Sequence, residues 1–81
     1  MEQTLGQKRV KAEFNPAKND LVDQIKNKSA ELIDLIEKLR TQDANGNATD
    51  LLSGEKARVI SIAQTEIEGA CHFAVKACFT N

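Results

Sequence analysis

The chain is poor in the residues that most often mark catalytic or metal sites. Among its 81 residues there are no tryptophans or tyrosines, three phenylalanines and a single histidine. The core must therefore be aliphatic. His72 and its neighbour Cys71 would point about 100° apart on a helix, so they do not converge on a metal. Because no Cys-x-x-Cys pair, glycine-rich phosphate loop or nucleophile elbow occurs, we expect no enzyme, metal site or cofactor.

Long apolar runs and a strong charge of one sign are also missing. The net charge of −1 argues against binding of a long nucleic acid. No run of some 18 apolar residues exists, and the segment from Glu2 to Thr4 lacks a signal-peptide pattern. We expect a cytosolic protein without a membrane segment. Cys71 and Cys78 would lie about 10.5 Å apart along one helix, too far for a disulfide, so we expect both reduced and buried.

What the chain does have is a long helical pattern between Asp20 and Arg40, where apolar residues step by three and four positions. The seam consists of Val22, Ile25, Leu32, Ile36 and Leu39, and Leu21, Ile33 and Leu35 widen it. The widened stripe covers about 160°, more than one partner helix can bury. Asn15 before Pro16, or else Asn19, would cap the start. The pattern predicts a helix over residues 16–40.

A second helix is predicted over residues 54–79, after a polar loop at residues 41–53 that contains Asn45-Gly46 and reverses the chain. Its small and apolar residues again alternate steps of three and four. They are Ile60, Ala63, Ile67, Ala70, Ala74 and Ala77. Gly69 costs roughly 1 kcal/mol relative to alanine within a helix, which suggests a close contact with another helix there.

Residues 1–15 lack helical spacing, and the run from Lys8 to Phe14 alternates polar and apolar residues, so we expect a short extended arm. The fold class is therefore all-α: one domain, an antiparallel helical hairpin with a short N-terminal arm. Both helices carry stripes too wide for a single neighbour. We expect the hairpin to assemble into a homo-oligomer.

The arm also contains the ingredients of a phosphate and base site. Lys8, Arg9 and Lys11 supply cationic donors close to the aromatic ring of Phe14. The simpler alternative is a solvated arm whose Phe14 fills part of the core.

Four positions on the predicted helices add weaker indications. Lys26 lies at the edge of the first apolar stripe and Lys28 within it, where each could face an anion at a subunit boundary or extend its ammonium to solvent. Arg58 lies near the start of the second helix, against the macrodipole preference, which favours an anionic partner. Thr65 lies in mid-helix, where its hydroxyl could simply bond to a backbone carbonyl.

Several segments together resemble a known family. The first half contains Arg9-Val10-Lys11-Ala12-Glu13-Phe14-Asn15-Pro16, Val22-Asp23-Gln24-Ile25-Lys26 and Ala30-Glu31-Leu32-Ile33-Asp34. The second half contains Glu55-Lys56-Ala57-Arg58, Ala63-Gln64-Thr65 and Phe73-Ala74-Val75-Lys76-Ala77. In order and spacing these resemble the small phage proteins of the anti-CBASS cyclic-oligonucleotide sponge type, over nearly the whole chain after about residue 8. The chain departs from that pattern at Phe14, where other branches have tyrosine, at Glu66-Ile67, and at His72-Phe73, where Met-Trp is more usual.

The resemblance implies a helical hairpin that forms a homohexamer and binds cyclic dinucleotides, and in some members cyclic trinucleotides, between protomers. Such a protein retains the messenger without cleaving it and prevents activation of CBASS effectors in the cytoplasm of the infected bacterial host. By the same resemblance, Phe14 stacks on a base and Lys26 pairs with a phosphate. The further candidates for ligand contact are Lys28, Arg58, Thr65, Arg9 and Asn15.

Other functions are compatible with the same residues. The main alternative is an oligomeric helical-hairpin adaptor or inhibitor that binds a protein partner through an apolar groove. A dimeric RNA-binding hairpin is disfavoured by the net charge, and a messenger-degrading enzyme by the lack of a metal or nucleophile constellation.

Overall fold

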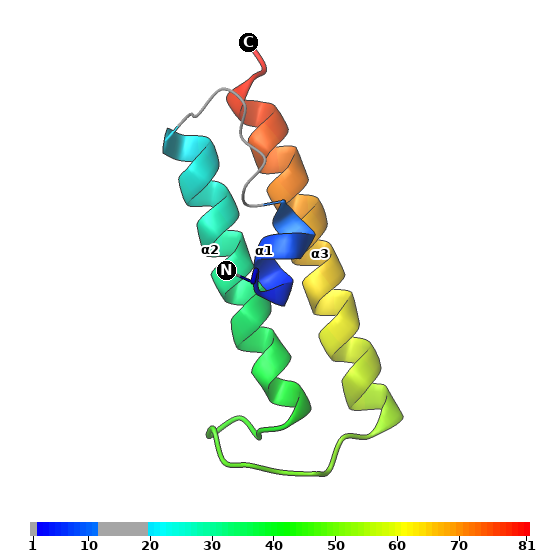
Figure 1. The fold of residues 1–81 in the computed structure, drawn as a ribbon. Helices are drawn as coiled ribbons and strands as arrows, with labels where there is room; N and C mark the ends of the chain where they lie inside the picture. Colours follow the sequence, from blue (N-terminus) through cyan, green and yellow to red (C-terminus); the bar gives the residue numbers. More distant parts are fainter. Residues whose placement is uncertain (1, 12–19) are drawn as a thin grey trace.

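The computed structural model describes residues 2–11 and 20–81. Their elements are α1 (Leu5–Val10), α2 (Asp20–Glu37), a short 3-10 helix η1 (Lys38–Arg40) and α3 (Gly54–Cys78). Helices α2 and α3 lie side by side and antiparallel, a long loop joins them at one end, and α1 packs across one face of the pair (Figure 1). The predicted all-α hairpin is thus confirmed for the described part of the chain.

The long helices begin and end close to the predicted residues. Helix α3 begins at Gly54 as predicted, because the Ser53 side chain accepts a hydrogen bond from the Lys56 N–H, and it ends at Cys78 with Phe79 as its C-cap. Helix α2 tightens into η1 over its last three residues instead of continuing as an α-helix to Arg40. The predicted first turn at residues 16–19 lies outside the described residues.

The predicted extended arm is wrong at residues 5–10, which form α1. A capping box begins this helix: the Thr4 hydroxyl accepts from the Gln7 N–H at 3.1 Å, and the Gln7 side chain accepts from the Thr4 N–H at 2.9 Å. The helix ends at Val10, and its C-cap Lys11 has a left-handed φ of 55°. A search for periodicity does not detect so short a helix, because its caps and its packing stabilise it rather than an apolar stripe.

Helix α1 approaches α2 closely at Gly6. A Cβ atom built on Gly6 would collide with the backbone of Ala30, so only glycine allows this contact. The Gly6 N–H also donates to Asp34 Oδ1 at 2.7 Å. Val10, on the same short helix, is fully buried. Backbone contact, a charge-assisted hydrogen bond and apolar burial together hold α1 on the hairpin.

The core is aliphatic, as expected, and lies where the three helices meet. Its buried members are Val10, Ala30, Ile33 and Cys71, with Ile25, Ile67 and Val75 packed against them. Both cysteines are free, as predicted, but Cys78 is exposed, so its predicted burial is wrong within this chain. It is the last residue of α3 and lies outside the core cluster that contains Cys71.

Much of the apolar surface predicted to pack remains uncovered in the single chain. Large exposed apolar residues on the two long helices are Leu21, Leu32, Leu35, Val59, Ile62 and Phe73. The helices therefore do carry stripes wider than one neighbour covers. The contact predicted at Gly69 is absent from the described part of the chain, since no atom lies within 4 Å of a Cβ built there.

The loop after η1 is a structured reversal. Asp43 Oδ1 accepts the N–H groups of Asn45 and Asn47, and Gly46 adopts a φ of 84° that favours glycine. Among the residues that the structure describes, no helix has both the length and the apolarity needed to cross a bilayer. Over the same ranges, no three histidine, cysteine or acidic side chains gather as metal ligands would.

Candidate functional site

Two pockets contain residues that were predicted to bind a ligand. The first, which we call the Lys26 pocket, has a volume of about 230 Å³ and is lined by Val10, Lys11, Lys26, His72 and Val75. The second, the Thr65 pocket, has a volume of about 370 Å³ and is lined by Arg58, Ser61, Ile62, Thr65 and Glu66. Residues from the end of α1, from α2 and from α3 meet in the first, whereas α3 alone lines the second.

Lys26 is buried more deeply than its predicted place at the edge of a stripe implied. Its side chain is only 5% exposed, and its Nζ donates to the Lys11 carbonyl at 3.1 Å. Burial of an ammonium is costly unless polar groups surround it, so this hydrogen bond helps to hold the charge in place. The left-handed backbone of Lys11 is part of the turn that brings this carbonyl to α2. The ammonium group of Lys26 is thus held beside a small pocket whose exposed surface is largely apolar.

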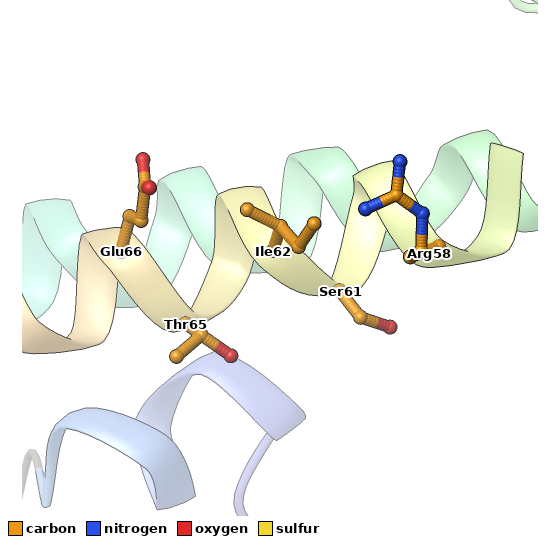
Figure 2. A pocket seen from close by; sticks show the side chains of 5 residues that line it. All are labelled: Arg58, Ser61, Ile62, Thr65 and Glu66. Atoms are coloured by element: carbon orange, nitrogen blue, oxygen red, sulfur yellow. The ribbon is translucent and has the colours of Figure 1, made fainter. Parts of the chain in front are cut away.

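The Thr65 pocket is an open surface depression (Figure 2). In Figure 2 the side chains of Arg58, Ile62 and Glu66 project to one side of α3, and Ser61 and Thr65 project to the other, with Thr65 next to α1. Arg58 is paired with Glu55 on its own helix at 2.7 Å, and both side chains are largely exposed. An incoming anion would compete with Glu55 for this guanidinium.

Arg9 connects α1 to the Thr65 pocket. Its Nη2 donates to Thr65 Oγ1 at 3.0 Å and to Glu68 Oε2 at 3.3 Å. Two residues predicted separately as ligand contacts, Arg9 and Thr65, are therefore in direct contact, although 56 positions separate them in the sequence. The Thr65 hydroxyl thus accepts a hydrogen bond from an arginine of another helix, whereas the simpler alternative was a bond to a backbone carbonyl of its own helix.

Of the other predicted site residues, the structure describes Lys28. Lys28 is exposed on α2 and lines neither pocket. Phe14 and Asn15 lie outside the described residues. Their predicted contacts, and that of Lys28, stay predictions.

A buried polar cluster that the sequence analysis missed joins the two long helices. Gln64 is 1% exposed, and its Nε2 donates to the Ile33 carbonyl at 3.2 Å and to Glu37 Oε1 at 2.9 Å. Arg40 donates to Gln64 Oε1 at 3.1 Å and to Ser61 Oγ at 2.9 Å. The signal was available, because Gln64 follows Ile60 by four positions and precedes Ile67 by three, which is a core position.

The same cluster lowers the pKa of the Glu37 carboxyl. The hydrogen bond from Gln64, followed by the hydrogen bond and charge of Arg40, lowers the pKa of the Glu37 carboxyl below its ordinary value of 4.5, and burial opposes them. Glu37 is therefore ionised at neutral pH. The carboxylate, the guanidinium of Arg40 and the Gln64 amide satisfy one another, which makes the cluster structural rather than a free anion site.

A short helix packed on an antiparallel helical hairpin, with a pocket lined by Lys11 and Lys26 beside it, defines a small helical hairpin domain. The chain belongs to the Acb2/Tad1 hairpin domain family, whose model matches residues 6–79. That family is known for binding cyclic oligonucleotides in anti-defence. No curated protein and no solved structure matches the chain.

Proposed function

We propose that this protein binds cyclic dinucleotides, and cyclic trinucleotides at a second site, and sequesters them without cleavage. Acting in the cytoplasm of an infected bacterial host, it would keep the messenger from CBASS effectors and so block their activation. The observation that carries this proposal is membership of the Acb2/Tad1 hairpin family over residues 6–79. Sequestration needs tight binding and slow release and no catalytic group.

The Lys26 pocket is the proposed site for the cyclic dinucleotide. Lys26 presents an ammonium with three donor hydrogens, so it can keep its bond to the Lys11 carbonyl while it donates to a phosphate. Val75 offers apolar surface to a sugar or a base. Phe14 follows Lys11 by three positions in the sequence, and we assign it the role of stacking on a base. Asn15 is proposed as an adjacent polar contact.

The Thr65 pocket is the proposed second site. Arg58 and the hydroxyls of Ser61 and Thr65 supply donors for phosphate oxygens. Arg9 reaches the same hydroxyl from α1 and would add a second guanidinium. A ligand there must draw Arg58 from Glu55, an exposed pair and therefore a weak competitor, and Arg9 from Glu68, a pair that is partly buried.

Both sites are proposed to be completed by further copies of the chain, in a homohexamer. The exposed apolar residues of α2 and α3 support this, because patches of this kind on a small domain mark surfaces that pack against a partner. Lys28 lies on α2 among these residues, so it would meet a ligand only at a subunit boundary. A cyclic dinucleotide has two phosphates related by approximate two-fold symmetry, which a symmetric boundary would match.

The decisive experiment incubates the purified protein with a panel of cyclic di- and trinucleotides, removes unbound ligand, denatures the protein and identifies what is released. We expect an intact cyclic dinucleotide. Lys26→Ala and Phe14→Ala should each weaken its retention at least tenfold, because each removes a phosphate or stacking contact. Lys38→Ala is the matched control, since Lys38 is an exposed lysine on η1 away from both pockets. Unchanged retention in both site variants would refute the site.

A helical adaptor that binds a protein partner is the second candidate. The exposure of Phe73 (74%) and Leu21 (65%) on α3 and α2 favours it, because an amphipathic segment could cover these side chains. It predicts that the panel releases no cyclic nucleotide. It further predicts that changing Phe73 and Leu21 to serine abolishes partner capture, while Lys26→Ala leaves it intact.

A further inference from the structure

We propose that His72 is an additional ligand-binding residue of the Lys26 pocket, where its imidazole donates to a phosphate and makes binding stronger at acidic pH. This inference rests on the proposed function and adds a residue to that site.

The geometry places His72 on the α3 wall of the pocket. Lys26 lines it from α2 and Lys11 from the end of α1, so cationic or potentially cationic groups from three elements converge on one space of about 230 Å³. Val75, one turn after His72 on the same helix, belongs to the same lining. His72 is exposed whereas Lys26 is buried, so a ligand that enters the pocket meets the imidazole at its rim and the ammonium inside it.

Among the residues that the structure describes, the charged side chains that line the pocket with His72 are both lysines. Lys11 and Lys26 face it from α1 and α2, and Lys76 lies one turn further along α3. The neighbouring carboxylates are Glu68, one turn earlier on α3 and paired with Arg9, and Asp23, one turn before Lys26 on α2. Within this lining, a protonated imidazole would stand beside two lysines.

A bound phosphate reverses this balance. Its negative charge lies between the ammonium and the imidazole and favours the protonated ring, which then donates a charge-assisted hydrogen bond. Histidine is the side chain whose charge most readily changes between pH 5 and 8. Binding of the ligand and uptake of a proton are thus linked, and affinity rises as the pH falls through this interval.

The test measures affinity for the retained cyclic dinucleotide by calorimetry at pH 6 and pH 8. The wild-type protein should bind about tenfold more tightly at pH 6, the effect of one charge-assisted hydrogen bond. His72→Gln keeps a hydrogen-bond donor that does not titrate, so it should remove this difference. Lys26→Ala should weaken binding at both pH values and keep part of the slope. A slope that persists in His72→Gln, or a wild-type affinity that does not change with pH, would overturn the inference and leave the proposed function standing.

A second measurement separates the pocket from its proposed messenger. His72 is the only histidine of the chain, so its ring protons give an unambiguous proton NMR signal. Titration with inorganic pyrophosphate should shift this signal and move its titration midpoint to higher pH in the wild-type protein, and less so in Lys26→Ala. That result together with no retained cyclic nucleotide would support His72 as an anion contact while refuting the proposed function. A signal that neither pyrophosphate nor any retained nucleotide moves would refute His72.

Discussion

Replacement of Gly6 by alanine is the sharpest test of how α1 is held. The added Cβ would collide with the carbonyl oxygen, carbonyl carbon and Cα of Ala30, which are all backbone atoms of α2. No side chain can rotate away to relieve this contact. The variant must either deform the helix or separate α1 from α2.

Either outcome costs a similar free energy. Overpacking in a rigid contact typically costs about 1–3 kcal/mol. Detachment would expose Val10, whose burial contributes roughly 1.5–3 kcal/mol, and break the bond from the Gly6 N–H to Asp34, offset by the backbone entropy regained. We expect the free energy of unfolding to fall by about 2–3 kcal/mol and the melting temperature by roughly 10–20 °C. Ligand binding should also weaken, because Lys11 and Arg9 belong to the same segment.

Urea and thermal unfolding followed by circular dichroism measure the stability, and hydrogen exchange at the Gly6 amide reports whether α1 stays in place. Gly54→Ala is the matched control, because a Cβ at Gly54 meets no atom within 4 Å and alanine is the better helix former. It should be neutral or slightly stabilising. A Gly6→Ala variant with wild-type stability and a protected amide would refute the close packing described for α1.

Three further predictions concern the polar groups of the hairpin. Gln64→Ala should lower the free energy of unfolding by about 2–4 kcal/mol, since it opens a cavity and leaves three hydrogen bonds unmade. The control Ser61→Ala should cost no more than about 1 kcal/mol. Equal effects of the two variants in denaturant titrations would contradict the central role of Gln64. The lowered pKa of Glu37 means that its ionised form stabilises the fold above pH 4.5, and that this contribution is lost as the pH falls through the folded-state pKa. The free energy of unfolding should therefore decrease in acid, and less steeply in Glu37→Gln. The same slope in both proteins would assign the effect to another group. Arg58→Ala should change stability by less than about 0.5 kcal/mol, because Arg58 and Glu55 are 62% and 69% exposed; a larger loss on thermal unfolding would show that this pair contributes more than a surface ion pair.

The long helices could be predicted from the sequence because their apolar spacing is sustained over many residues. Val22 and Ile33 on α2 and Ile60 on α3 were assigned to packed stripes, and all three are buried. Helix α1 could not be predicted in the same way. Six residues give too few periods to recognise, and the features that stabilise this helix are a capping box and a glycine that fits only against Ala30.

The candidate site was predictable in its residue types but not in its arrangement. Lys26 was singled out as a cation near an apolar stripe, yet its burial depends on the Lys11 carbonyl, which only the left-handed end of α1 brings to it. His72 was considered only as a metal ligand, because nothing in its local sequence indicates that α1 and α2 complete a pocket around it. The burial of Lys26 and the place of His72 at the pocket both depend on contacts between segments far apart in the chain.

The buried amide of Gln64 also sets the register of the hairpin. Apolar stripes alone would allow α3 to slide by one helical turn, about 5.4 Å, and still bury aliphatic side chains. Such a slide would take the Gln64 amide away from Ile33, Glu37 and Arg40 together and leave buried polar groups without partners. This one side chain therefore fixes how the two long helices are aligned along their axes. Because Lys26 on α2 and His72 on α3 line the same pocket, the contacts of Gln64, about two turns before His72 on α3, also fix how these two residues lie relative to each other.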